Sequence, residues 1–212
     1  MPQGDHAGLW RPALLTLPVP IILWYIMFGL RPLNFWLEMS ISTLGLSVLA
    51  FAVGGRILPR ENFTPASVLL GIGSALILYF IFWMGDLISG YLFTFKNSQV
   101  LAIYANRAEA SPVLVGLLLF LAIGPGEELY WRGLIQHAFS ARFGPYPAWI
   151  ITAVIYALVH IWSFNFMLIM AALVGGLFWG WLYLRTGSLG TVLISHAVWD
   201  VAIFILFPIT HG

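Results

Sequence analysis

The sequence predicts an all-α integral membrane protein, a bundle of about seven to eight transmembrane helices, and three observations support this fold class. Hydrophobic residues make up 61% of the 212-residue chain and charged residues only 8%, whereas a soluble domain carries about 25% charged residues. Apolar stretches of about 20 residues, the length that crosses a bilayer, recur along the chain. Proline, glycine and charged residues separate these stretches, as expected where spans end.

The apolar stretches predict seven spans in order. The first, LLTLPVPIILWYIMFGL, lacks the small-residue cleavage site of a signal peptide, so we expect a retained helix. The third and fourth are long enough to be tilted, kinked or broken, and Asp86 is a candidate end for the membrane part of the third. Segment 96–112 is the longest polar connection. We place the spans near 12–30, 36–54, 66–94, 112–141, 146–163, 165–185 and 188–207.

Charge and composition exclude several classes of function. The net charge is +1 and no basic cluster is present, which argues against a nucleic-acid partner. The chain has no cysteine, so disulfides, thiolate nucleophiles and cysteine metal sites are excluded. Short loops and the lack of an organelle signal predict a multi-pass protein of the prokaryotic cytoplasmic (inner) membrane.

The distribution of basic residues predicts the orientation. By the positive-inside rule, the side with more Lys and Arg faces the cytoplasm, so we expect a cytoplasmic N-terminus and an outer C-terminus. The N-terminal side carries Arg11, Arg56, Arg60, Arg142 and Arg185, and the opposite side carries Arg31, Lys96 and Arg107.

Ionisable residues inside three of the last four spans mark a candidate site. Each costs about 2.5–3.5 kcal/mol to insert, so such residues face a bundle interior and serve a function. They are Glu127, Glu128 and Arg132 on the fourth span, His160 on the fifth, and His196 and Asp200 on the seventh.

Helical spacing separates the two glutamates of GPGEELYWRG. Glu128 and Arg132 are four residues apart and share a helix face, which predicts an ion pair. Glu127 points about 100° away and stays available for chemistry. Pro125 and Gly126 precede the pair, and proline removes a backbone donor, so we expect a loosened or broken helix here.

These residue types suit amide hydrolysis without a covalent nucleophile. A carboxylate and an imidazole that converge on a water form a general base, and a second imidazole stabilises an oxyanion. The sequence lacks the G-x-S-x-G elbow of serine hydrolases. Ser195 is expected on a different helix face from its neighbour His196.

Three motifs give the chain a family resemblance. EELYWR (127–132), YALVH (156–160) and HAVWD (196–200) resemble, in order and spacing, the EExxxR, FxxxH and HxxxN motifs of the CAAX protease and bacteriocin-processing (CPBP/Abi) family, which includes type II CAAX prenyl endopeptidases. Two positions depart from the pattern: Tyr156 replaces Phe and Asp200 replaces Asn. The resemblance covers 112–207 and implies a four-helix catalytic core there, preceded by transmembrane helices and a loop over 1–111.

The resemblance implies a glutamic-type intramembrane protease that acts on a membrane-associated peptide or protein. Glu127 and His160 would activate the water, and His196 with Asp200 would stabilise the oxyanion. Glu128 and Arg132 would form a supporting ion pair, and no cofactor is expected. Tyr156 and Trp131 are interpreted as packing aromatics.

Asp200 leaves two interpretations open. An ionised carboxylate would repel an oxyanion, whereas a protonated one can donate a hydrogen bond to it. Alternatively, Asp200 accepts a ring proton of His196 and orients that imidazole, the interpretation we favour.

Three other functions compete with proteolysis. In a zinc-dependent membrane hydrolase, Glu127, His160, His196 and Asp200 would be the ligands, although no HExxH motif is present. A proton-coupled transporter would show an inverted repeat, and we find none. A non-catalytic peptide-binding or immunity protein would keep the same residues, and an assay separates it from an enzyme.

Overall fold

The computed structural model describes residues 8–55, 57 and 63–209, and the regular structure of these residues is entirely helical. Seven helices are long and apolar enough to cross a membrane, which confirms the predicted fold class. Each predicted span boundary lies within two residues of the observed one. The spans are Trp10–Leu30, Phe35–Gly54, Pro65–Leu92, Pro112–Phe143, Pro145–Ser163, Phe166–Thr186 and Leu189–Leu206.

Several spans consist of more than one helical segment. The first three spans are α1 (Trp10–Thr16) with α2 (Pro18–Tyr25) and the π-helical turn η2 (Ile26–Leu30), then α3 (Phe35–Gly54), then α4 (Pro65–Leu92). The fourth combines α6 (Pro112–Leu118), η5 (Leu119–Ile123), α7 (Gly124–Glu128), η6 (Leu129–Gln136) and α8 (His137–Phe143). The last three are α9 (Pro145–Val159) with η7 (His160–Ser163), α10 (Phe166–Thr186), and α11 (Leu189–Val201) with η8 (Ala202–Leu206).

Local sequence signals set where these helices begin and end. The Asn34 side chain caps α3 by accepting from the backbone N–H of Trp36. Thr64 and Ser67 form a capping box at the start of α4, and Pro65 between them occupies the first helical position. Gly187 ends α10 with a φ of 62°, a left-handed conformation that glycine adopts without strain.

The polar connection after the third span contains a short helix. Segment 96–112 forms α5 (Lys96–Ala105) and the 3₁₀ turn η4 (Asn106–Glu109). α4 continues through Asp86 to Leu92, and the end of the membrane part of this span at Asp86 stays a prediction. Its carboxylate pairs with the ammonium of Lys96, and both side chains are buried, so the pair ties α4 to α5.

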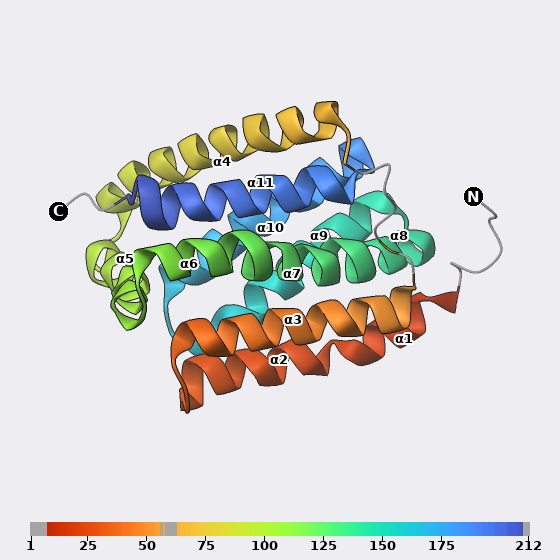
Figure 1. Cartoon of the computed structure of the whole chain (residues 1–212), viewed down its shortest axis with the longest axis horizontal. Coiled ribbons are helices and arrows are strands. Elements are labelled where there is room, and N and C mark those ends of the chain that lie inside the picture. Colours follow the sequence, from red (N-terminus) through yellow and green to blue (C-terminus); the bar gives the residue numbers. More distant parts are fainter. Residues whose placement is uncertain (1–7, 56, 58–62, 210–212) are drawn as a thin grey trace.

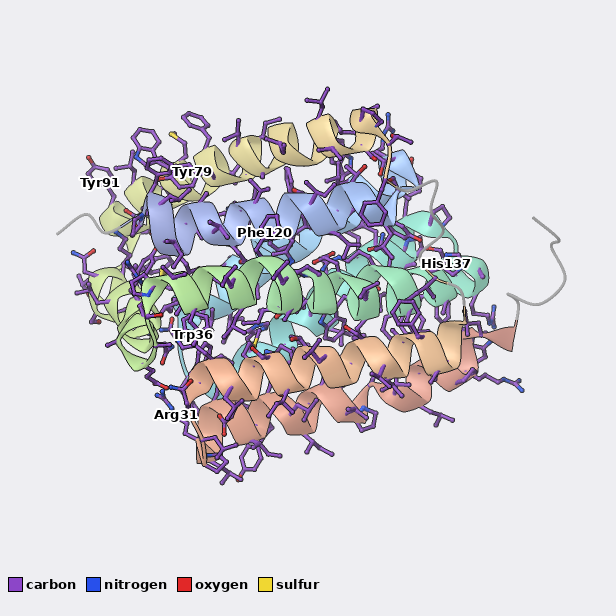
Figure 2. The ribbon with its side chains drawn as sticks, in the orientation of Figure 1. Arg31, Trp36, Tyr79, Tyr91, Phe120 and His137 are labelled. Carbon is purple, nitrogen blue, oxygen red and sulfur yellow. The ribbon has the colours of Figure 1, made fainter. Side chains whose placement is uncertain are left out.

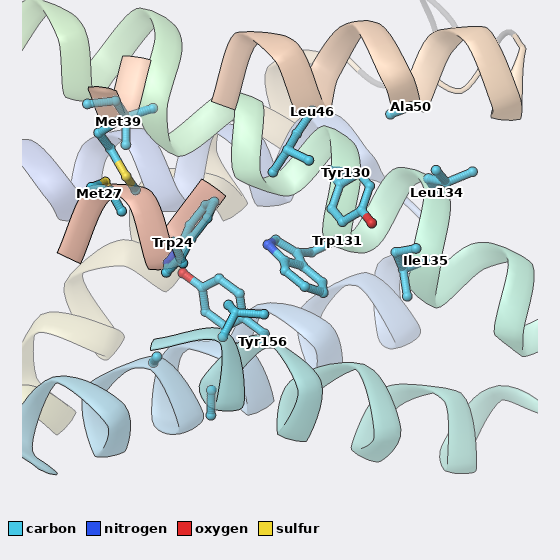
Figure 3. Packing of buried hydrophobic residues seen from close by; sticks show 14 of the residues in the cluster. Trp24, Met27, Met39, Leu46, Ala50, Tyr130, Trp131, Leu134, Ile135 and Tyr156 are labelled. Carbon is cyan, nitrogen blue, oxygen red and sulfur yellow. The ribbon is translucent and has the colours of Figure 1, made fainter. Parts of the chain in front are cut away.

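The helices pack as one bundle in which α4 lies along α11 at one edge and α2 and α3 lie at the opposite edge (Figure 1). Large aromatic side chains fill the centre, among them Trp24, Tyr130, Trp131 and Tyr156 (Figure 3). The glycines of α10 allow α9 to approach this helix closely. A Cβ at Gly176 would lie 3.3 Å from Ala153 of α9, and one at Gly180 would lie 2.7 Å from the Trp149 ring.

Apolar side chains also cover the outer surface of the bundle. Figure 2 shows side chains projecting from the outer surface of the bundle, among them Tyr91, which is 92% exposed. Exposed leucine, isoleucine, valine and phenylalanine side chains occur on all seven spans. Soluble proteins rarely expose contiguous apolar surface on this scale. The chain is therefore a multi-pass integral membrane protein, and its assignment to a prokaryotic cytoplasmic membrane stays a prediction.

Three of the basic residues lie at the ends of the bundle to which the sequence assigned them. The first span begins at one end and the seventh ends at the other (Figure 1). The guanidinium groups of Arg11 and Arg142 both lie over the Trp10 ring, so these residues share an end. Arg31 pairs with Glu109 of η4 at the opposite end. Arg56 and Arg60 lie outside the described residues, and which end faces the cytoplasm stays a prediction.

Candidate active site

The fourth span is widened around the two glutamates. We expected a loosened or broken helix at Pro125, but the helix continues over Pro112–Phe143. The π-helical segments η5 and η6 flank α7, which holds both glutamates in five residues. Pro125 has no N–H to give to the helix ladder, and a π segment absorbs such an irregularity without ending the helix. Short π segments inside α-helices are frequent at functional sites.

Glu128 lies at the centre of a buried cluster of charged side chains. Its Oε1 accepts hydrogen bonds from Nη1 of Arg132 and from Nδ1 of His196, both at 2.7 Å. Arg132 also donates from Nη2 to the carbonyl oxygen of Gly176 at 3.0 Å. The side chains of Glu128 and Arg132 are 0% exposed. The ion pair expected from the spacing is therefore present, and it also holds His196, which the spacing did not indicate.

Glu127 points to a different helix. Its Oε2 accepts a hydrogen bond from the Tyr156 hydroxyl of α9. The interpretation of Tyr156 as a packing aromatic was therefore incomplete. Tyrosine in place of phenylalanine in the second motif was the only sequence signal for this contact, because the pair is separated by 29 residues along the chain.

His160 is held by the backbone of the same tyrosine. Its Nδ1 lies 2.8 Å from the carbonyl oxygen of Tyr156. A carbonyl oxygen only accepts, so Nδ1 carries the proton and Nε2 of the neutral ring keeps a lone pair. The ring packs edge-on against Trp24, with 5.7 Å between ring centroids. His160 therefore has the tautomer that a general base requires.

His196 is oriented by Glu128 rather than by Asp200. Oδ1 of Asp200 lies 3.6 Å from Nε2 of His196, which is longer than a hydrogen bond. The His196 ring stacks on Trp179 at 3.6 Å between centroids with an interplanar angle of 19°, which fixes its plane. The expected hydrogen bond from His196 to Asp200 is therefore not formed, although the two groups lie within ion-pair distance, and the role of Asp200 stays a prediction.

The expected site residues share one cavity. It has a volume of about 620 Å³, within the roughly 300–1,000 Å³ of typical ligand pockets. Its polar wall contains Glu127, Tyr156, His160, His196 and Asp200. Glu128 and Arg132 do not line it. The fourth, fifth and seventh spans therefore bring these residues to one space.

Most of the cavity wall is apolar and comes from other helices. Phe82 and Ile88 of α4, Val100 of α5, and Met170 and Ala171 of α10 contribute to it. Two further residues, Ile81 of α4 and Val174 of α10, line both the cavity and a shallow apolar groove that contains Trp149 and Trp181. An apolar wall with a few convergent polar groups suits an extended peptide better than an ion.

Serine and metal chemistry have less support from the geometry. Ser195 accepts hydrogen bonds from Ser74 of α4 and from Nε1 of Trp179, and it does not line the cavity. Within the part of the chain that the structure describes, no three His, Asp or Glu side chains are grouped so as to hold a metal ion. The four ligands expected for a zinc enzyme line the cavity but do not form such a group.

Comparison with known proteins identifies the segment that carries the site. Residues 109–202 match the family model described as type II CAAX prenyl endopeptidase, Rce1-like. No curated protein and no solved structure matches the chain. The matched segment contains all three motifs and spans the helices from α6 to the end of α11, so the resemblance given by the motifs is confirmed. Residues 109–202 therefore form a domain of the Rce1-like type II CAAX prenyl endopeptidase family.

Proposed function

We propose that this protein is an intramembrane endopeptidase that hydrolyses a peptide bond of a membrane-associated protein or peptide. The observation that carries the proposal is the cavity inside the bundle, where Glu127, His160, His196 and Asp200 from three spans meet. The family of the 109–202 domain is one of endopeptidases, which agrees with this chemistry. The apolar remainder of the wall favours a substrate held in or near the bilayer.

Glu127 and His160 are proposed to activate the attacking water. Tyr156 engages Oε2 of Glu127, which leaves Oε1 for the water, and Nε2 of His160 offers a second acceptor. The water oxygen forms a bond to the scissile carbonyl carbon while its proton passes to Glu127. When the tetrahedral intermediate collapses, the carbon–nitrogen bond breaks and Glu127 returns the proton to the leaving amine.

His196 and Asp200 are proposed to stabilise the oxyanion of that intermediate. Nδ1 of His196 donates to Glu128, so the donor that remains for the oxyanion is Nε2 of a ring that carries both protons. Asp200 adds a second donor when its carboxyl is protonated. Donors held in place before the reaction contribute roughly 10²–10³-fold each to turnover.

A substitution in the cells that produce the protein tests the proposal. Replacing Glu127 with Gln keeps the shape of the side chain but removes the base, and loss of a general base lowers turnover by about 10²–10⁴-fold. Mass spectrometry of membrane peptides should then show a precursor that accumulates in Glu127→Gln cells and is cleaved in wild-type cells. The purified wild-type protein should cleave that precursor in the presence of a zinc chelator.

The matched control is Glu109→Gln. Glu109 pairs with Arg31 at the end of the bundle, does not line the cavity, and should leave the membrane peptides unchanged. Identical membrane peptides in wild-type and Glu127→Gln cells, at equal protein levels, would contradict the peptidase proposal. Loss of cleavage in the chelator would contradict the metal-independent mechanism.

A further inference from the structure

We infer that Tyr156 is a positioning residue that holds both members of the water-activating pair, Glu127 through its hydroxyl and His160 through its carbonyl oxygen. The inference rests on the proposed function, because it names how that site is kept in order. The sequence interpretation gave Tyr156 no role beyond packing, and four features of its surroundings now support this one.

The hydroxyl of Tyr156 distinguishes the two oxygens of the Glu127 carboxylate. It donates to Oε2, and both side chains line the cavity. A carboxylate with one oxygen engaged cannot rotate freely, so Oε1 stays turned to the space where a water would bind. A hydrogen bond to a charged group is stronger than one between neutral groups, and this one lies where water is largely excluded.

The carbonyl oxygen of Tyr156 is free to hold His160 because the helix tightens at this point. α9 ends at Val159 and continues as the 3₁₀ turn η7. The backbone N–H of His160 therefore bonds to the carbonyl oxygens of Ala157 and Leu158. In a regular helix it would reach the carbonyl of Tyr156. The side-chain Nδ1 of His160 takes that place at 2.8 Å.

Packing fixes the Tyr156 ring, so its hydroxyl has little freedom to leave Glu127. Trp131 lies edge-on to the ring at 5.4 Å between centroids, and both residues belong to the same buried cluster (Figure 3). On α10, a Cβ at Gly176 would approach Cδ1 of Tyr156 to 3.1 Å. The guanidinium carbon of Arg132 lies 5.1 Å from the ring centroid. The ring is thus held from the fourth and sixth spans.

The two positions that depart from the family motifs meet in this cavity. Tyr156 adds a hydroxyl donor and Asp200 adds a carboxyl group, and both side chains line the same wall. A phenylalanine at 156 would keep the ring packing and the carbonyl contact to His160 but could not hold Oε2 of Glu127. The hydroxyl is therefore the part of Tyr156 that the inference concerns.

The test compares Tyr156→Phe with Tyr130→Phe. Tyr130 is a second fully buried tyrosine; its hydroxyl shares a 2.8 Å hydrogen bond with Thr16, and it does not line the cavity. Each variant of the full chain, reconstituted in lipid vesicles, is given the precursor that accumulates in Glu127→Gln cells. Turnover (kcat), KM and the thermal midpoint are measured for each.

We expect Tyr156→Phe to lower kcat by about 10- to 100-fold, the range for a hydrogen bond to a charged group. KM should change by less than about twofold, because a contact that acts only on the reacting groups leaves ground-state binding unchanged. Tyr130→Phe should keep the wild-type kcat and should lower the thermal midpoint as much as Tyr156→Phe does. A purely structural role would give both variants the same kinetics.

Three results would overturn the inference, and they separate it from the proposed function. Wild-type kcat in Tyr156→Phe together with inactive Glu127→Gln removes the role of Tyr156 and leaves the peptidase proposal standing. A rise in KM with unchanged kcat makes Tyr156 a binding residue instead. Full activity of Glu127→Gln removes the proposed function, and the inference with it.

Discussion

At the scale of single residues, the site places three carboxyl groups beside one arginine in the interior of the bundle. Glu128 has strong partners in Arg132 and His196, and Glu127 has the Tyr156 hydroxyl. Asp200 approaches His196 only to 3.6 Å. Buried carboxylates are costly unless paired or protonated, so Asp200 is the carboxyl most suited to carry a proton and donate it in a hydrogen bond.

The Asp200→Asn substitution tests this role through the dependence of kcat on pH. An aspartic acid donates to an oxyanion only while it is protonated, so this contribution in the wild type is lost as pH rises through its titration. An asparagine donates at every pH, so Asp200→Asn should lose less activity at alkaline pH than the wild type, whereas the loss of the charged His196 donor should occur in both proteins. The expected difference in kcat at alkaline pH is about 10- to 100-fold, which is equal to or smaller than the loss caused by removing one oxyanion donor.

Asp200→Leu is the matched control, because leucine is similar in size and has no donor. It should be slow across the whole pH range. Identical alkaline limbs for the wild type and Asp200→Asn would contradict the protonated-donor role, since the other titratable groups of the site, Glu127, His160 and His196, are the same in both proteins.

At the scale of elements, the position of Glu127 depends on how closely α7 meets α3. Gly126 precedes the two glutamates and faces Thr43 of α3. A Cβ at Gly126 would lie 2.8 Å from the backbone oxygen of Thr43, which no flexible side chain can relieve. Glycine is therefore required at this position for the close approach of two helices, a role that the sequence did not indicate.

We expect Gly126→Ala to separate α7 from α3 and to shift Glu127. The strain should lower the free energy of unfolding by about 1–3 kcal/mol. A displacement of about 1 Å at a reacting group costs up to about 10²-fold in turnover, so kcat should fall by about 10- to 100-fold. Unfolding in mixed micelles and precursor cleavage measure the two effects.

Gly73→Ala on α4 controls for the helical preference of alanine. A Cβ at Gly73 would meet nothing within 4 Å, so this variant should be neutral or more stable by up to about 1 kcal/mol. Equal stability and activity of Gly126→Ala and Gly73→Ala would show that the approach of α7 to α3 does not matter for the site.

At the scale of the whole molecule, the cavity exists because helices from both halves of the chain enclose it. The fourth, fifth and seventh spans supply the candidate catalytic side chains of its wall, whereas α4 and α5 supply much of its apolar wall. The 109–202 domain therefore does not form the cavity alone. The first half of the chain contributes to the space where a substrate would bind, although it carries none of the three motifs.

Filling the cavity from α4 should block the substrate without unfolding the protein. Gly85 lines the cavity, and a Cβ there would meet no atom within 4 Å. Gly85→Phe should lower kcat/KM by about 10- to 100-fold, in line with steric discrimination in apolar pockets. The thermal midpoint should stay near the wild-type value. Precursor cleavage and thermal unfolding check both expectations.

Gly90→Phe is the control on the same helix. Gly90 has the same open surroundings but does not line the cavity, so kcat/KM should stay at the wild-type value. If Gly85→Phe cleaved the precursor as fast as Gly90→Phe, the apolar part of the cavity would not be the binding site.

The sequence by itself determined the helices and most residues of the candidate site. Hydropathy gave each span boundary within two residues, because a bilayer requires about 20 apolar residues in a row. The cost of burying charge singled out the ionisable residues of the fourth, fifth and seventh spans. The four-residue spacing of Glu128 and Arg132 predicted their ion pair, because the two residues lie about one turn apart on a single helix.

Only the tertiary structure decided which of these residues contact one another. Glu128 meets His196 across 68 residues of chain, and Glu127 meets Tyr156 across 29. Neither contact follows from the helical period, because each depends on the relative rotation and axial position of two packed helices. Pro125 illustrates the same limit. Its missing N–H is a local property, but whether the helix breaks or widens into π turns depends on the neighbouring helices that hold both sides of it in place.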